Sequence, residues 1–225
     1  LALLAAMAVA EGLLFQIALQ NALDGEPLGL EQVISESRIA LVCGLGFLLL
    51  CALLSLTGSE FRGGKLGYTL RRLSVSERGV LLWWAGYNAV CLFLFWVAQL
   101  AIALLLCRLY LSRMDPAYTS AQTVFLAFYR SDFLHSLLPL AEVSRYARNG
   151  VLILCLGVCA ACFSWRQRRG QRGVAVVALA GITAVSFPQA MGSFSGDLLL
   201  AFVALGITAT ALAGVWKEHG DEIAA

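Results

Sequence analysis

Six long apolar blocks alternate with shorter polar segments along the chain. The blocks cover residues 1–20, 39–56, 80–111, 150–165, 173–190 and 198–216. A helix needs about 20 apolar residues to cross the hydrocarbon core of a bilayer. Charged residues lie almost entirely between the blocks, as expected where a charge at mid-membrane costs several kcal/mol. The pattern predicts an all-α fold: a polytopic bundle of six transmembrane helices that forms a single transmembrane domain over residues 1–225.

Composition supports a membrane protein and excludes some other classes. Of the 225 residues, 60% are hydrophobic and 13% are charged, against about 45–50% and about 25% in soluble domains. The net charge of +2 gives no reason to expect a nucleic-acid partner. The first block could instead be a cleaved signal peptide, but it is long for the apolar region of such a peptide, so we expect a retained span.

The distribution of basic residues predicts the orientation. Residues 58–78 hold five arginines and lysines and residues 166–172 hold four, whereas residues 21–37 hold none. Short loops rich in lysine and arginine stay on the cytoplasmic side. Six spans then place both basic loops and both termini in the cytoplasm. The abundance of arginine, alanine and leucine suggests a GC-rich bacterial genome, and hence the bacterial cytoplasmic membrane.

Residues 119–138 are apolar but also contain Arg130, Asp132 and His135. A seventh span here would bury these polar groups and move the second basic loop outside the cell. We therefore expect an external amphipathic helix on the membrane surface, between spans three and four. Pro139 would end or bend it. A re-entrant element is the alternative.

Glu11 is the intramembrane polar candidate, because it lies inside the first apolar block. A carboxylate at that depth is a candidate for a proton or ion relay or for a substrate contact. Alternatively, the helix enters the membrane later than predicted, or Glu11 is protonated and bonded to a neighbouring helix. Asn88 and Gln99 of the third block are the candidate partners.

Motifs for catalysis, cofactors and metals are weak or missing. In the segment Gly-Ser-Phe-Ser-Gly at 192–196, Phe194 stands where a nucleophile elbow needs serine, so this segment predicts a tight turn. Cys155, Cys159 and Cys162 share a helix face, which could suit copper(I) or zinc, but packed thiols are favoured because no fourth ligand lies on this helix. The sequence has no phosphate-binding G-x-x-x-x-G-K-[ST] loop. We expect no catalytic, cofactor or metal site, and no enzyme activity in the chain by itself.

The basic segment 58–78, after the second block, is the most informative stretch of the sequence. Its spacing predicts a short amphipathic helix, followed by a helix start with Ser74 as the cap and Glu77 three residues into the helix. The third block follows at once. The alternative is a plain basic loop that only sets the topology. The candidate contact residues on the short helix are Leu66, Thr69, Leu70, Arg71, Arg72 and Leu73.

This segment resembles the loop after the second span in membrane subunits of ABC-2 type ABC transporters. The resemblance is carried by Glu60, Gly67, Thr69, Leu70, Leu73, Val75, Ser76 and Arg78. Ser74 stands where proline is usual in the family, and Tyr68 separates Gly67 from Thr69. The family also places its external helical elements between spans five and six, rather than between spans three and four.

The resemblance implies that residues 66–73 are a coupling helix that docks into a separate cytoplasmic ATPase. It also implies a permease subunit that pairs with itself or with a sister permease. Two alternatives stay open. An accessory or scaffold membrane protein is favoured by the shortage of polar residues in the blocks. A small secondary transporter would use Glu11, but it would also call for an internal repeat that the sequence does not display.

Overall fold

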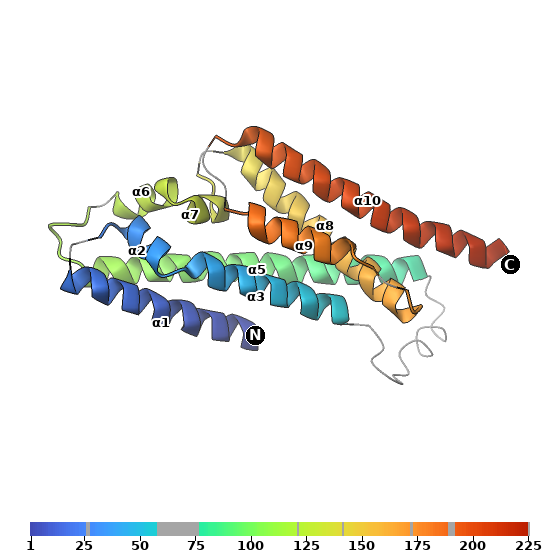
Figure 1. The fold of residues 1–225 in the computed structure, drawn as a ribbon, viewed down its shortest axis with the longest axis horizontal. Coiled ribbons are helices and arrows are strands. Elements are labelled where there is room, and N and C mark those ends of the chain that lie inside the picture. The colour runs from blue at the N-terminus through green and yellow to red at the C-terminus, as the bar shows by residue number, and fades with distance from the viewer. Residues whose placement is uncertain are drawn as a thin grey trace. The chain divides into compact units, whose positions relative to one another are not determined.

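The computed structural model describes residues 1–25, 28–57, 77–120, 122–140, 142–171, 173–188 and 192–224. In these ranges every regular element is a helix, which confirms the all-α prediction (Figure 1). The helices are α1 (Ala2–Asp24), α2 (Leu30–Glu36), α3 (Ile39–Leu56), α5 (Glu77–Arg113), α6 (Thr123–Arg130), α7 (Asp132–Leu137), α8 (Val143–Arg168), α9 (Ala175–Ser186) and α10 (Phe194–Ala224).

Five of the described helices are long and apolar enough to cross a membrane. They are α1, α3, α5 over Arg78–Arg113, α8, and α10 over Phe194–Lys217. Their exposed surface suits lipid, because large apolar side chains line it at helical spacing. On α3, for example, the exposed side chains include Leu41, Leu45, Leu49 and Leu53. These helices indicate a multi-pass membrane protein.

The predicted fifth span, residues 173–190, is realised as the shorter helix α9. This helix is apolar but has 12 residues, so it extends about 18 Å at about 1.5 Å per residue. The hydrocarbon core is about 30 Å thick. Whether α9 and its flanking residues make a sixth crossing therefore stays a prediction.

The predicted fourth span begins earlier than expected. Helix α8 starts at Val143 rather than at residue 150, and it continues to Arg168. Its first turns contain Arg145, Arg148 and Asn149, all of which are buried. The sequence pattern excluded these residues from the span because they are polar, and the structure includes them because other elements supply their partners.

Within residues 119–138, the structure describes two short helices, α6 and α7, rather than the one helix predicted. Ser131 has an extended backbone between α6 and α7, and its Oγ accepts a hydrogen bond from the Leu134 N–H at 3.5 Å, as a cap of α7 does. Helix α7 ends at Leu137, two residues before Pro139, as the residue preceding a proline disfavours the helical conformation. Whether the two helices lie outside the membrane stays a prediction.

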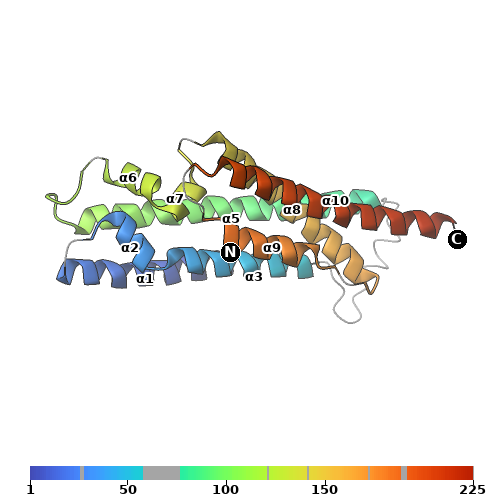
Figure 2. The same ribbon diagram turned by 45° about the horizontal axis from the view of Figure 1, so that its top comes forward.

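The chain divides into two compact units. The first contains Leu1–Phe47, Leu94–Tyr146 and Ser186–Ser193. In it α1, the first half of α3 and the second half of α5 run alongside one another in both views (Figures 1 and 2). Phe47 and Phe95 join α3 to α5, with ring centroids 6.3 Å apart. Tyr110 of α5 donates a hydrogen bond to the Leu28 carbonyl just before α2, at 2.8 Å.

The second unit contains Leu48–Phe93, Ala147–Val185 and Phe194–Ala225. Helix α8 is the most buried of the five span-length helices. Of the residues in its apolar stretch, 61% are buried, against 28–33% in the other four. Gly157 allows α5 to approach it closely, because a Cβ there would lie 2.9 Å from the Ala85 carbonyl oxygen. On α8, Ser164 donates a hydrogen bond to the Ser55 carbonyl of α3 at 2.8 Å. The polar contacts of α8 therefore tie the spans of this unit together.

Candidate functional site

The predicted coupling helix lies outside the described residues. This applies to all six of its contact candidates: Leu66, Thr69, Leu70, Arg71, Arg72 and Leu73. The structure describes the two flanks of the segment. Helix α3 ends at Leu56, as predicted, and α5 is described from Glu77 onward. The segment therefore connects two span-length helices.

Glu11 lies on the buried face of α1 in the first unit. It shares this face with Met7, Phe15 and Ala18, which recur at helical spacing, and its side chain is fully buried. Gln99 of α5 donates a hydrogen bond from its Nε2 to Glu11 Oε2 at 2.9 Å. This confirms Gln99 as a partner of Glu11. Asn88, the other candidate, donates instead to the Gly157 carbonyl at 3.4 Å, within the second unit.

Two oxygen atoms of the Glu11–Gln99 pair face no donor in the described part of the chain. Glu11 Oε1 and Gln99 Oε1 are both buried, and neither has a hydrogen-bond partner among the described residues. Buried polar atoms are nearly always hydrogen-bonded in folded proteins. The pair is therefore incomplete when Glu11 is an ionised carboxylate, which makes it a candidate binding site.

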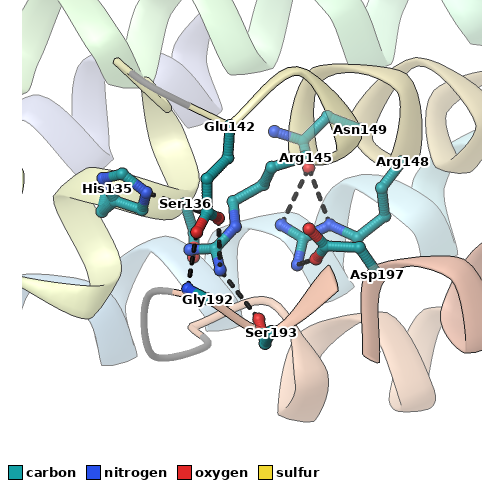
Figure 3. A network of polar contacts seen from close by, with 9 residues as sticks. All are labelled: His135, Ser136, Glu142, Arg145, Arg148, Asn149, Gly192, Ser193 and Asp197. Atoms are coloured by element: carbon teal, nitrogen blue, oxygen red, sulfur yellow. Dashed lines mark hydrogen bonds and ion pairs between the residues drawn. The ribbon is translucent and has the colours of Figure 1, made fainter. Parts of the chain in front are cut away.

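A second polar cluster of the first unit centres on Glu142, directly before α8 (Figure 3). Arg145 Nη2 lies 3.0 Å from Glu142 Oε2, and the Gly192 N–H donates to Glu142 Oε1 at 2.6 Å. His135 of α7 is buried, and its Nε2 lies 3.6 Å from Glu142 Oε2. That distance exceeds a normal hydrogen bond but allows an ion pair when the imidazole is protonated.

Arg145 extends this cluster to two serines. Its Nη1 donates to Ser136 Oγ of α7 at 3.4 Å, and its Nη2 donates to Ser193 Oγ at 2.9 Å. Gly192 has φ +79°, so the chain turns at the start of the predicted segment 192–196. The rest of that prediction is wrong, because residues 194–196 form the first turn of α10. Ser193 thus serves as a hydrogen-bond acceptor for an arginine. The cluster joins α7, the start of α8 and the turn before α10.

The environment of Glu142 favours its ionised form. Partial burial raises the pKa of this carboxyl, but the Gly192 N–H, the Arg145 guanidinium and His135 together outweigh burial and hold the pKa below its ordinary value. Glu142 is therefore a carboxylate at neutral pH. It forms a charge-assisted link between the α7–α8 connection and the turn before α10.

A buried ion pair lies in the second unit, between α8 and α10 (Figure 3). Arg148 Nη1 lies 3.0 Å from Asp197 Oδ1, and their side chains are 0% and 1% exposed. Asn149 Oδ1 accepts two more hydrogen bonds from Arg148, at 3.2 Å from Nε and 3.0 Å from Nη2. Asp197 lies in the first turn of α10, where the helix dipole stabilises a negative charge.

Sequence reasoning missed Glu142, Arg145, Arg148 and Asp197 as site residues. One signal could have found the first three. Their spacing of three places them on one face at the start of a helix, beside an apolar block. Asp197 had no such signal, because it stands alone just before the last block and its partner is 49 positions away.

The cysteines form no described metal site. All seven are free, and Cys155, Cys159 and Cys162 are buried on α8. Cys159 Sγ lies 3.5 Å from Thr208 Oγ1 of α10. Among the residues that the structure describes, no group of three or more histidines, cysteines or acids could hold a metal ion.

No protein-family model, curated protein or solved structure matches this chain.

Proposed function

We propose that this chain is the membrane-spanning permease subunit of an ABC transporter in a bacterial cytoplasmic membrane. A separate cytoplasmic ATPase drives it through residues 58–78, and both chain termini lie in the cytoplasm. The observation that carries the proposal is the place of this basic segment. It connects α3 to α5, and its spacing predicts a short amphipathic helix followed by a helix start.

Helix α5 suits the transmission of a force from such a segment. It runs without a break for 37 residues, or about 56 Å, which exceeds the hydrocarbon core of about 30 Å. Residues 77–93 belong to the second unit and residues 94–113 to the first. A pull on residues 66–73 during ATP-driven closure would therefore act on a helix that has residues in both units.

Buried polar residues favour a permease over a passive scaffold. The spans bury Glu11, Asn88, Gln99, Arg145, Arg148, Asn149 and Asp197. An accessory protein is favoured by a shortage of polar residues in the apolar blocks, and these buried groups weaken that reason. A polar residue in a span is costly and is usually retained for a function. The permease would pair with itself or with a sister permease.

Affinity purification in mild detergent from the native cells tests the proposal. We expect a nucleotide-binding ATPase to co-purify in stoichiometric amount with the tagged chain and to hydrolyse ATP. Leu70→Asp with Arg71→Glu should reduce ATPase recovery at least tenfold. The two changes introduce a negative charge at residue 70 and reverse the positive charge at residue 71, both on the predicted docking helix. The amount of chain in the membrane should not change.

A matched control changes the same kinds of residue in the same segment. Phe61→Asp with Arg62→Glu alters one apolar and one basic side chain outside residues 66–73, and it should leave ATPase recovery intact. A preparation without any ATPase would overturn the proposal and favour an accessory role. Equal loss in both double variants would refute residues 66–73 as the coupling helix.

The orientation has its own test, which depends on α9. If α9 crosses the membrane, reporter fusions after residue 217 and within residues 58–78 report the same side, the cytoplasm. If α9 does not cross, the five long helices place the two fusions on opposite sides. The second result would contradict the cytoplasmic placement of both termini.

A small secondary transporter is the second candidate, and the burial of Glu11 is the observation that favours it. In that case Glu11→Gln abolishes proton uptake into proteoliposomes that contain the chain alone. An ATP-driven permease requires no such uptake.

A further inference from the structure

The Glu11–Gln99 pair joins α1 to α5 inside the first unit, and its hydrogen bonds can be counted atom by atom. Gln99 offers two N–H donors and one oxygen acceptor, whereas an ionised glutamate offers acceptors alone. Gln99 Nε2 donates a hydrogen bond to Glu11 Oε2, at 2.9 Å. Glu11 Oε1 and Gln99 Oε1 have no donor among the residues that the structure describes.

An ionised Glu11 would be poorly stabilised in this position. The side chain is 0% exposed, and a buried charge costs many kcal/mol unless it is paired and hydrogen-bonded. Gln99 is the one side chain among the described residues with a hydrogen bond to Glu11. On α3, in the same unit, the buried Cys43 thiol supplies no positive charge.

We propose that Glu11 is a proton-binding site, occupied at neutral pH, and that its proton is donated from Oε1 to Gln99 Oε1. The carboxylate takes one proton from water, and no other bond changes. The same proton makes Glu11 Oε1 a donor and gives Gln99 Oε1 a partner. Together with the Gln99 N–H bond, it closes an acid–amide ring of two hydrogen bonds that ties α1 to α5.

A proton fits this site better than a metal ion does. Calcium takes six to eight oxygen ligands, and magnesium requires a near-complete octahedron. The pair offers two unpartnered oxygens, and no metal-binding group of histidines, cysteines or acids is found in the described part of the chain. Two oxygens suffice to share one proton.

The ring makes the contact between α1 and α5 depend on a proton. Loss of the proton would leave one hydrogen bond and a charge between the helices. This contact between α1 and α5 does not involve residues 66–73, so its dependence on a proton can be tested separately from any coupling to an ATPase.

Infrared difference spectroscopy of the purified chain in detergent at neutral pH tests the proton directly. A protonated carboxyl has a C=O stretching band that is separate from the bands of a carboxylate. Subtracting the spectrum of Glu11→Gln from that of the wild type should reveal one protonated-carboxyl band. Glu142→Gln is the matched control, because Glu142 is held as a carboxylate by Arg145 and the Gly192 N–H, so its difference spectrum should contain no such band.

Two further variants test the ring. In Gln99→Leu the Glu11 band should shift to higher frequency, because the C=O group loses its hydrogen bond. In Glu11→Gln with Gln99→Glu the acid and the amide exchange places, and a protonated-carboxyl band should return.

The outcomes are distinct. A protonated-carboxyl band that disappears in Glu11→Gln supports the proton site, and its shift in Gln99→Leu supports the ring. If Glu11→Gln removes a carboxylate band instead, Glu11 is ionised and the proposal is overturned. If the band does not move in Gln99→Leu, the proton is present but the ring is refuted.

Discussion

Glu11 in the first unit and Asp197 in the second are both buried acids on span-length helices, yet they differ in their partners. Asp197 faces the Arg148 guanidinium at 3.0 Å, whereas Glu11 faces the neutral Gln99 amide at 2.9 Å. An arginine stabilises a carboxylate by charge and by hydrogen bonds. An amide donates a hydrogen bond but supplies no net charge.

Burial alone therefore does not determine how an acid is stabilised inside the protein, because the charge of its partner also matters. The Arg148 guanidinium compensates the charge of Asp197, so removal of either member would leave the other charge in the interior without that partner. Glu11 is better accommodated as a neutral acid, for which an amide is a complete partner. The two pairs should therefore respond very differently to substitution.

The largest effect is expected at Asp197. Asp197→Ala leaves the buried Arg148 charge without its carboxylate and should lower the free energy of unfolding by about 3–5 kcal/mol. Denaturant unfolding in detergent micelles measures this. Asp197→Leu with Arg148→Met removes both charges and should recover most of the loss. A double variant as unstable as the single one would contradict the charge argument.

Gln99→Leu comes next. It removes the partner of the buried Glu11 and should cost about 1–3 kcal/mol, the penalty for an unsatisfied buried polar group. The unfolding free energy in the same detergent provides the measurement. Adding Glu11→Leu should restore stability, because both polar groups are then gone. If the added change lowers stability further, Glu11 has another partner.

Glu142 extends the comparison to a partly exposed acid, whose side chain is 17% exposed. Glu142→Gln should cost about 1 kcal/mol at neutral pH, since hydrogen bonds to a charged group are lost. The pKa of Glu142 is lowered from its ordinary value of 4.5 in the folded chain. Its stabilising contribution is therefore complete above about pH 4.5 and disappears as the pH falls through the folded pKa.

Unfolding midpoints of the wild type and Glu142→Gln, recorded as a function of pH, check the sign. The two curves should converge below about pH 4.5. Divergence on acidification would mean that the pKa of Glu142 is raised in the folded chain, and that burial outweighs Gly192 and Arg145.

The smallest effect is expected for Glu11→Gln, within about 0.5 kcal/mol of the wild type. Glutamine has the shape of a neutral glutamic acid, and a Gln–Gln pair can form two hydrogen bonds without a proton. The same replacement at the ion pair, Asp197→Asn, should be far more harmful. Equal losses in the two variants would remove the distinction between the two acids.

Most of the helices can be predicted from the pattern of apolar residues. The block 39–56 and helix α3 coincide, because Arg38 and Thr57 bound a run of 18 residues without a charge. Apolar residues in such a run gain by leaving water whatever their neighbours are, so length and composition suffice to locate a span. Glu11 could be identified from the sequence because it is a charged residue inside such a run, residues 1–20.

Which polar residues enter the spans, and which groups they pair with, depends on how the helices pack. Arg145 and Arg148 extend α8 by seven residues beyond its apolar block because Glu142 and Asp197 compensate their charges, and Asp197 comes from a helix 49 positions along the chain. Gln99 became the partner of Glu11 through the packing of α1 against α5. The physical reason is that burial of an apolar group depends on the residue itself, whereas burial of a charge depends on a partner that packing alone brings near.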